Sequence, residues 1–158
     1  MKKVLITGGA GFIGYFLTKK LIQFDYEVHL VDNFSRGVED KYLKELIENK
    51  SVQFHNIDLL DSNKLSILGN DYYYIFHLAA IVGVKNVLLD PFNVLIQNQL
   101  LLGNLIAFAK TQKKLNRFVF SSTSEVYACT LKDFGLEFPT PEDTPLSVGF
   151  KHESRNTY

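Results

Sequence analysis

The sequence predicts an α/β fold: a doubly wound parallel sheet with helices on both faces, truncated after about five strands. Two observations predict it. Short apolar runs alternate with longer amphipathic or charged segments along most of the 158 residues, and such runs are typical of parallel strands that are covered on both faces. The first apolar run also leads directly into a glycine-rich turn. Strands that alternate with helices imply a parallel sheet joined by right-handed crossovers.

The first half of the chain supplies three of the strands. Lys3–Thr7 is a short, mostly apolar run, and residues 11 to 24 are predicted to form an amphipathic helix. The apolar side chains of this helix recur at i, i+4 spacing: Phe12 and Phe16, then Ile13, Leu17 and Leu21. The elements expected next are a strand at Glu27–Val31, a charged helix at Asp40–Asn49, a strand at Ser51–Asn56 and a short helix around residues 62 to 69.

The second half supplies two more strands and a long helix. Tyr73–His77 is the fourth predicted strand, and Arg117–Ser121 is the fifth. Between them, Pro91 stands where a long helix can begin, and apolar residues continue to about Gln112. Three of the four prolines fall between residues 139 and 145, which predicts a loop, and no strand or helix is expected after it.

Composition excludes several classes of function. Lys and Arg balance Asp and Glu at 17 each, so the net charge favours neither a nucleic-acid nor a membrane-surface partner. Cys129 is the single cysteine, so an internal disulfide or a multi-cysteine metal site is not expected. The longest apolar stretch, near Leu100–Phe108, is interrupted by Gly103 and Asn104. We therefore expect no metal, no signal peptide, no transmembrane helix and a cytoplasmic location.

The glycine-rich turn has the spacing of a phosphate-binding turn. Gly8, Gly11 and Gly14 are spaced GxxGxxG, and a GxGxxG pattern also fits. Glycine permits a positive φ after the strand, close approach of a phosphate to the backbone, and close packing of the helix on the sheet. Phe12 and Ile13 begin the helix, where free N–H groups and the helix dipole attract a pyrophosphate. A tight strand-to-helix turn without a ligand is the alternative.

Asp32 follows the second strand, 18 residues after Gly14. A carboxylate at this position accepts hydrogen bonds from adenosine ribose hydroxyls and repels a 2′-phosphate, which favours NAD over NADP. A turn-forming aspartate is the alternative for Asp32. Arg36 lies nearby and is interpreted as a solvated loop cation.

Residues after the third and fourth strands belong to the same predicted edge of the sheet. Loops at the carboxyl ends of parallel strands line the ligand crevice, so Asp58 and Leu59 are expected to contact the adenine. The alternative for Asp58 is the N-cap of the following helix. His77 is interpreted as a packed strand residue, and Ala79 and Ala80 after it allow a cofactor to pass close to the backbone.

Several motifs together resemble one family. In order these are Thr7 to Gly14, Asp32-Asn33, Asp58, His77 to Ala80, Asn98, and Ser121 to Tyr127. This series is similar to the extended short-chain dehydrogenases of the NAD-dependent nucleotide-sugar epimerase/dehydratase family, over essentially the whole chain. The resemblance implies a Rossmann-type NAD-binding domain over residues 1–158. It implies NAD contacts from the glycine turn and from Asp32, Asn33, Asp58, Leu59, Leu78, Ala79, Ala80, Asn98 and Ser121.

The resemblance also implies catalytic roles. Thr123 matches the Ser or Thr that hydrogen-bonds the sugar hydroxyl being oxidised. Ser124 and Glu125 match members that resemble sugar-nucleotide 4,6-dehydratases and UDP-glucuronate decarboxylases, in which a second acid/base supports elimination or loss of CO₂. Hydroxyls that cap a turn are the alternative for Thr123 and Ser124. For Glu125 the alternative is a solvated acid in the first turn of a helix.

Tyr158 matches the tyrosine of the family's Tyr-x-x-x-Lys motif, which implies the base that takes the sugar C4 hydroxyl proton. The lysine position, a sixth strand and a sugar-binding region are absent from the 158 residues, so we expect this fragment by itself to be nearly inactive. The resemblance implies a homodimer for the whole enzyme. Leu101 stands where the family often has glycine, and its larger side chain puts the family's usual dimer geometry in doubt.

Two alternative functions are a stand-alone, non-catalytic NAD-binding module and a reductase of a non-sugar hydroxy or keto substrate. Epimerase, dehydratase and decarboxylase chemistry all stay open.

Overall fold

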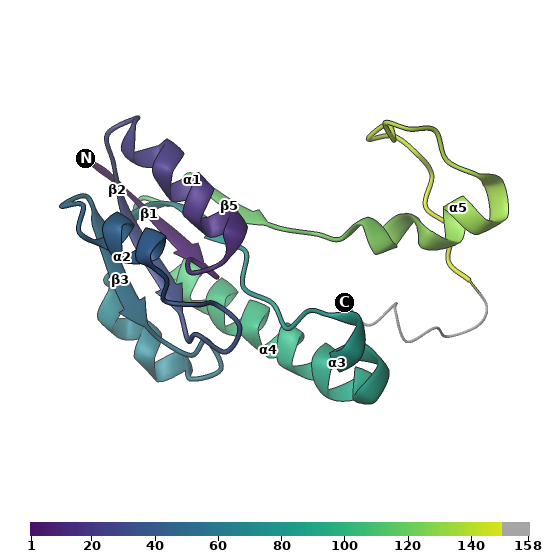
Figure 1. Ribbon diagram of the computed structural model, residues 1–158, viewed down its shortest axis with the longest axis horizontal. Coiled ribbons are helices and arrows are strands. Elements are labelled where there is room, and N and C mark those ends of the chain that lie inside the picture. Colours follow the sequence, from purple (N-terminus) through teal and green to yellow (C-terminus); the bar gives the residue numbers. More distant parts are fainter. Residues whose placement is uncertain (150–158) are drawn as a thin grey trace. The chain divides into compact units, whose positions relative to one another are not determined.

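The computed structural model describes residues 1–149 (Figure 1). The chain forms two compact units, which are described separately. Unit 1 comprises Met1–Ala80 and Gln99–Ser121, and unit 2 comprises Ile81–Asn98 and the chain from Ser122 onward. The assignment of residues 1–158 to one domain stays a prediction.

Unit 1 contains a five-stranded parallel sheet, which confirms the predicted fold class. Its strands are β1 (Lys2–Thr7), β2 (Tyr26–Asp32), β3 (Val52–Asn56), β4 (Tyr72–His77) and β5 (Arg117–Phe120). Their order is β3-β2-β1-β4-β5, with Val4 of β1 in register with Val28 of β2 and Tyr74 of β4. The chain therefore winds outward from β1 in both directions, and the carboxyl end of β1 is the switch point where doubly wound sheets bind ligands.

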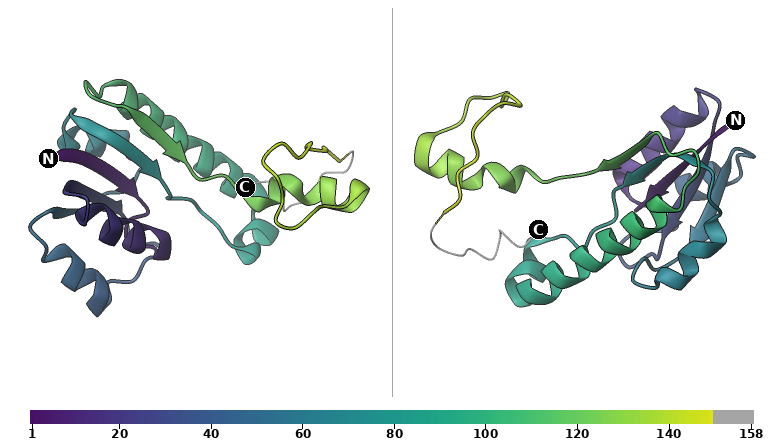
Figure 2. Two further views of the ribbon diagram at one scale, coloured as in Figure 1. Left: turned by 90° about the horizontal axis from the view of Figure 1, so that it is seen from above. Right: turned by 180° about the vertical axis from the view of Figure 1, so that it is seen from behind.

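Helices cover both faces of this sheet (Figure 2). They are α1 (Phe12–Ile22), α2 (Lys41–Ile47), the 3₁₀ helix η1 (Ser62–Leu68) and the Gln99–Lys110 part of α4 (Pro91–Lys110). One core joins Val4 and Ile6 of β1 to Leu43 and Leu46 of α2. The other core contains Leu5 and Ile75 of the sheet, Leu65 and Leu68 of η1, and Leu105 and Phe108 of α4. The central strand is buried on both faces, as its continuous apolar run predicts.

Helix α1 differs from the predicted amphipathic stripe. Phe12, Ile13 and Phe16 are 80%, 62% and 53% exposed, whereas Gly14 and Thr18 are the buried residues of the helix. The Thr18 hydroxyl donates to the Gly14 carbonyl at 2.7 Å. Gly14 packs against Gly8 and Gly9 of the turn, and Leu17 and Leu21 of the predicted stripe pack against the core. The prediction is therefore confirmed for these two leucines and wrong for Phe12, Ile13 and Phe16.

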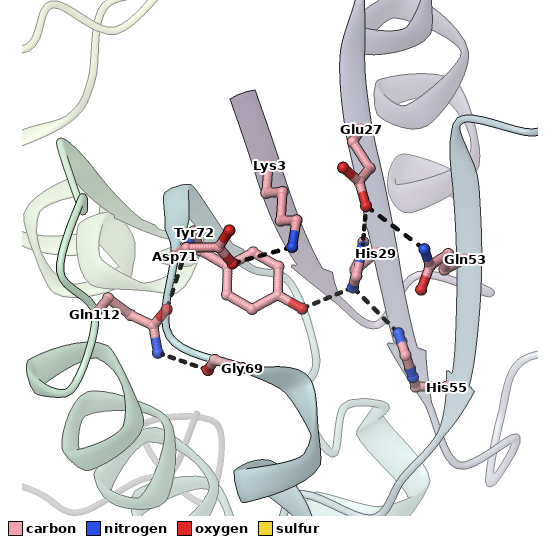
Figure 3. Close-up of polar contacts among 9 residues, drawn as sticks. All are labelled: Lys3, Glu27, His29, Gln53, His55, Gly69, Asp71, Tyr72 and Gln112. Atoms are coloured by element: carbon pink, nitrogen blue, oxygen red, sulfur yellow. Dashed lines mark hydrogen bonds and ion pairs between the residues drawn. The ribbon is translucent and has the colours of Figure 1, made fainter. Parts of the chain in front are cut away.

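A polar network crosses the sheet inside the core (Figure 3). Tyr72 of β4 reaches past β1, and its hydroxyl lies 2.7 Å from Nδ1 of His29 in β2. Nε2 of His29 lies 3.0 Å from the Glu27 carboxylate, and His55 of β3 lies 3.2 Å from His29 Nδ1. Because a carboxylate only accepts, Nε2 of His29 carries the proton and Nδ1 accepts from Tyr72. The network satisfies polar groups that would otherwise be costly to bury.

Helix α4 confirms the long helix predicted to begin at Pro91. It runs through Gly103 and Asn104 and is long and apolar enough to cross a membrane by length and composition, contrary to the expectation that no stretch approaches that length. One such helix is weak evidence, and Leu101, Leu105 and Phe108 pack into the core of unit 1. Leu101 is 8% exposed, so its bulk is accommodated by the sheet.

Unit 2 contains the Pro91–Asn98 part of α4, which the sequence predicts, and three short helices that it does not predict. These are α3 (Val84–Leu89), the 3₁₀ helix η2 (Ser124–Tyr127) and α5 (Ala128–Phe134). Thr130 of α5 is buried, and its hydroxyl donates to the Pro145 carbonyl at 3.0 Å and accepts from the Ser147 N–H at 2.8 Å. This hydroxyl ties the proline-containing loop to α5.

Candidate cofactor-binding site

Close packing leaves no room for a Cβ at Gly8 in the turn after β1 or at Gly14 in the first turn of α1. Gly8 has a φ of 71°, and a Cβ there would lie 2.8 Å from the Ala79 nitrogen. A Cβ on Gly14 would lie 2.7 Å from the Gly8 carbonyl oxygen. The Gly8 N–H donates to the Val31 carbonyl at 2.8 Å, which anchors the turn to β2. The turn is therefore closely packed against the ends of both strands that flank β1.

Gly11 has a different environment. A Cβ on Gly11 would meet a single protein atom within 4 Å, the Gly8 carbonyl oxygen at 3.2 Å. Gly11 is also the N-cap of α1 and supplies no side-chain hydrogen bond, so the N–H groups of Phe12 and Ile13 in the first turn have no side-chain cap. An open glycine beside uncapped N–H groups fits an external anion such as a pyrophosphate.

Asp32 connects the loops that follow β1 and β2. Its Oδ2 accepts from the Ala10 N–H at 3.1 Å, and its Oδ1 accepts from the Phe34 N–H at 2.8 Å. The second bond is the turn that the sequence offers as an alternative role. A carboxylate has about four acceptor positions, so two remain for ribose hydroxyls. The turn-forming and ribose-binding roles of Asp32 are therefore compatible.

Asp58 lies in the loop after β3 and contacts the loop after β2. Its Oδ1 accepts from the Leu60 N–H at 2.9 Å, and its Oδ2 accepts from the Asn33 side-chain amide at 3.2 Å. Asp61, not Asp58, is the N-cap of η1, because its carboxylate accepts from the Asn63 N–H at 3.2 Å. The alternative role of Asp58 as a helix cap is therefore wrong.

The end of β4 contacts the glycine turn through backbone atoms. Leu78 donates its N–H to the Thr7 carbonyl at 3.1 Å, and the Ala79 backbone lies directly against Gly8. His77 is 2% exposed, and its Nδ1 lies 2.7 Å from the Thr7 hydroxyl. Burial lowers the pKa of His77 to about 4, so its imidazole is neutral at pH 7. His77 is a packed strand residue, as predicted.

The other predicted site residues of unit 1 lie at the same edge of the sheet. Leu59 is buried, Ala80 is exposed, and Ser121 donates its N–H to the His77 carbonyl at 3.2 Å, which extends the pairing of β4 with β5. Unit 1 thus brings the glycine turn, Asp32, Asn33, Asp58 and Ala79 to the carboxyl ends of β1 to β4.

Unit 2 holds the remaining predicted residues. The side-chain amide of Asn98 forms two hydrogen bonds with the backbone of Ile81. Its Oδ1 accepts from the Ile81 N–H at 2.8 Å, and its Nδ2 donates to the Ile81 carbonyl at 3.0 Å. The Thr123 hydroxyl oxygen accepts from the Glu125 N–H at 3.2 Å and caps η2, which Ser124 begins. This cap uses one acceptor position and leaves the hydroxyl proton of Thr123 available to donate. Tyr158 lies outside the described residues.

Sequence reasoning missed three contributors. Ala10 offers its N–H to Asp32, and Gly37 lies where a Cβ would be 2.8 Å from the Ala10 Cβ and 3.3 Å from Asp32 Oδ1. A glycine five residues after Asp32 is the only signal of that close approach in the sequence. Asn104 of α4, mentioned above only as a break in an apolar stretch, contacts the loop after β3.

Comparison with known proteins identifies the family. The model of the NAD dependent epimerase/dehydratase family matches residues 4–148. The chain belongs to this family.

The similar members are longer proteins, and two of the three described here are named for a nucleotide-sugar substrate. A UDP-N-acetyl-alpha-D-glucosaminuronate decarboxylase of Bacillus cytotoxicus is 40% identical over 126 residues, which are 80% of this chain and 38% of that protein. An epimerase of Methanothermobacter thermautotrophicus matches 94% of this chain and 41% of its own, with 30% identity and a TM-score of 0.77. A UDP-glucose 4-epimerase of Bifidobacterium longum, solved with NAD⁺ and UDP, matches 92% of this chain and 43% of its own, with 26% identity and a TM-score of 0.76. The chain therefore spans less than half the length of these members of the epimerase/dehydratase family.

Proposed function

We propose that this chain binds NAD and supplies the cofactor-binding part of an enzyme that oxidises the sugar of a nucleotide sugar at C4 and then returns the hydride. Two neighbouring features support the proposal: the N-terminus of α1 is open and uncapped at Gly11, and the Asp32 carboxylate lies at the carboxyl end of the adjacent strand β2. Phosphates and ribose hydroxyls of a dinucleotide need these two groups at neighbouring strand ends. The family model and the NAD⁺-bound neighbour agree with this assignment.

The residues of unit 1 would divide the binding of NAD among them. The first-turn N–H groups of Phe12 and Ile13 would hold the pyrophosphate, and Asp32 would accept from the adenosine ribose. The negative charge of Asp32 favours NAD over NADP, because it repels a 2′-phosphate. Asp58 and Leu59 would contact the adenine, and the small side chains of Ala79 and Ala80 would leave room beside the backbone.

Bound NAD would accept a hydride from sugar C4 and later return it. The chain's own contribution is to orient the sugar and to move protons. Thr123 would hydrogen-bond the C4 hydroxyl, and Tyr158 would take its proton. Ser124 and Glu125 would supply a further acid/base, which favours decarboxylation or elimination of the C4-keto sugar. The 40% identity to a nucleotide-sugar decarboxylase agrees with this branch.

A nucleotide-sugar epimerase is the second candidate, because the two solved neighbours named above are epimerases. Epimerisation needs only the return of the hydride to the opposite face of the sugar, so it requires no carboxylate at Glu125. For the whole enzyme we propose a cytoplasmic location and a homodimer.

The test is to incubate the 158-residue chain with NAD and, separately, with UDP-glucuronate, UDP-N-acetylglucosaminuronate and UDP-glucose. We expect saturable NAD binding by equilibrium dialysis and no sustained product formation by mass spectrometry. Absence of NAD binding would overturn the proposed function. Sustained turnover would contradict the expected inactivity of this chain, and its product would identify the branch.

A further inference from the structure

The side-chain amide of Asn104 joins α4 to the loop that follows β3. Its Nδ2 donates to the Leu59 carbonyl at 2.8 Å and lies 3.3 Å from the Leu60 carbonyl. Asn104 is half-buried in the Gln99–Lys110 part of α4, so both partners belong to unit 1. A helix of the sheet's outer layer is thereby tied to a loop at its ligand-binding edge.

The peptide between Leu59 and Leu60 is bonded at both ends. Its carbonyl accepts from Asn104, and its N–H, on Leu60, donates to Oδ1 of Asp58. Because a peptide is planar, a bond at the carbonyl fixes the direction of the N–H on the other side. Asn104 therefore fixes the donor that orients the Asp58 carboxylate.

Asp58 has few other restraints. Asn33 donates to its Oδ2 at 3.2 Å in an exposed contact, and the Asp61 N–H donates to its backbone carbonyl at 3.0 Å. The loop between β3 and η1 spans five residues, in which the Ile57 and Leu59 side chains are buried in the core and Leu60 is 40% exposed. These buried side chains anchor the loop without restraining the rotation of the Leu59–Leu60 peptide directly. Without Asn104, the Leu59–Leu60 peptide would be held from one end only, and the carboxylate would sample more orientations.

We propose that Asn104 is a positioning residue for the adenosine end of NAD, which acts on Asp58 through the Leu59–Leu60 peptide. The inference rests on the proposed NAD-binding function and adds a residue that does not itself contact the cofactor. A carboxylate held at one angle accepts a hydrogen bond from the exocyclic amino group of adenine and repels a carbonyl oxygen at the same position. Asn104 would therefore affect base discrimination as well as affinity.

The surroundings of Asn104 make substitution informative. An open groove of about 530 Å³ is lined by Asn104, Ser62, Ser66, Leu65, Ala107 and Phe108. Asn104 thus faces solvent space on one side, and Leu60 is 40% exposed, so loss of the amide is expected to loosen the loop rather than unfold the chain.

A matched control exists at the opposite end of the sheet. The side-chain amide of Gln112 also clamps backbone groups, with Nε2 3.3 Å from the Gly69 carbonyl and Oε1 accepting from the Tyr72 N–H at 3.2 Å (Figure 3). Tyr72 begins β4, so this clamp lies at the amino ends of the strands, away from the predicted site.

The experiment compares Asn104→Leu with Gln112→Leu. Isothermal titration measures affinity for NAD and for nicotinamide hypoxanthine dinucleotide, in which a carbonyl oxygen replaces the adenine amino group. Amide hydrogen exchange of Leu60 and Asp61 is measured without ligand. We expect Asn104→Leu to weaken NAD binding about tenfold, to abolish the preference for NAD over the hypoxanthine analogue, and to accelerate exchange in the loop. Gln112→Leu should leave all three unchanged.

The outcomes separate this inference from the proposed function. If the unaltered chain does not bind NAD, the proposed function fails. If it binds NAD but does not prefer it to the analogue, or if Asn104→Leu keeps the preference and the exchange rates, the role of Asn104 is overturned. Equal weakening of both dinucleotides also overturns it, because a merely structural residue would do that. If Asn104→Leu does not fold, Asn104→Ala decides by the same readouts.

Discussion

Asp32 accepts backbone N–H groups from the loops after both β1 and β2, and at the residue scale it is the best-placed acceptor for a ribose. A short polar side chain at the end of a strand is common in turns, and here it performs that role as well. Two backbone hydrogen bonds leave acceptor positions on the carboxylate open, so the turn-forming role of Asp32 is compatible with the proposed ribose contact. The two backbone bonds hold the carboxylate in place before a ligand arrives.

Replacing Asp32 by alanine should weaken NAD binding about ten- to a hundredfold, the effect of losing hydrogen bonds to a charged acceptor. Asp40→Ala is the matched control, because Asp40 caps α2 by accepting from the Leu43 N–H at 2.9 Å and lies outside the predicted site. Loss of that cap should cost about 1 kcal/mol of stability without changing NAD affinity. Equal effects of the two substitutions on affinity, measured by calorimetry, would refute the ribose contact.

Two glycines of the turn should respond differently to a methyl group. Gly14→Ala places a Cβ 2.7 Å from the Gly8 carbonyl oxygen, so we expect a loss of about 1–3 kcal/mol of stability. Gly11→Ala meets only one oxygen at 3.2 Å, so it should cost less than about 1 kcal/mol yet weaken NAD binding at least about tenfold. Urea unfolding and NAD titration of both variants provide the measurement. A Gly11→Ala chain with unchanged NAD affinity would exclude the pyrophosphate from this turn.

At the scale of elements, the contact between β1 and β4 depends on a neutral histidine. Burial holds the pKa of His77 near 4, whereas an unfolded histidine has a pKa near 6.5. A depressed histidine pKa contributes stability above pH 6.5 that is lost as the pH falls toward 4. Burial and the neighbouring His29 also lower the pKa of His55, which acts in the same direction.

Acidification from pH 7 to pH 4.5 should therefore cost the folded chain about 2–3 kcal/mol through His77. In His77→Asn this part of the loss should be absent, because the amide oxygen can still pair with the Thr7 hydroxyl and does not titrate. Urea unfolding at the two pH values measures the difference. Parallel pH profiles for the variant and the original chain would show that His77 is not buried in its neutral form.

Elements that depend on local pattern could be predicted from the sequence, and elements that depend on packing could not. Continuous apolar runs located all five strands to within about two residues. The apolar spacing of α1 correctly placed Leu17 and Leu21 against the core, but not the exposed Phe12 and Phe16, because Gly14 packs against the turn and Thr18 is buried beside it along the helix. Helices α3, η2 and α5 are short, and their sequences carry no sustained helical periodicity.

At the scale of the whole molecule, site residues could be predicted when their residue type and their position directly after a strand identify them. The glycines of the turn, Asp32 and Asp58 could be predicted in this way. Ala10, Gly37 and Asn104 could not be predicted, because their contacts join segments 22 or more residues apart in sequence or depend on a close approach of two loops. Division of the chain into two units is likewise a property of contacts and not of composition.

Unit 1 is proposed to form an NAD site that discriminates against a 2′-phosphate. The most direct test is isothermal titration of the 158-residue chain with NAD and with NADP under the same buffer conditions. We predict saturable binding of one NAD per chain and at least about tenfold weaker binding of NADP. No saturable heat with NAD, or equal affinity for both dinucleotides, would contradict the account.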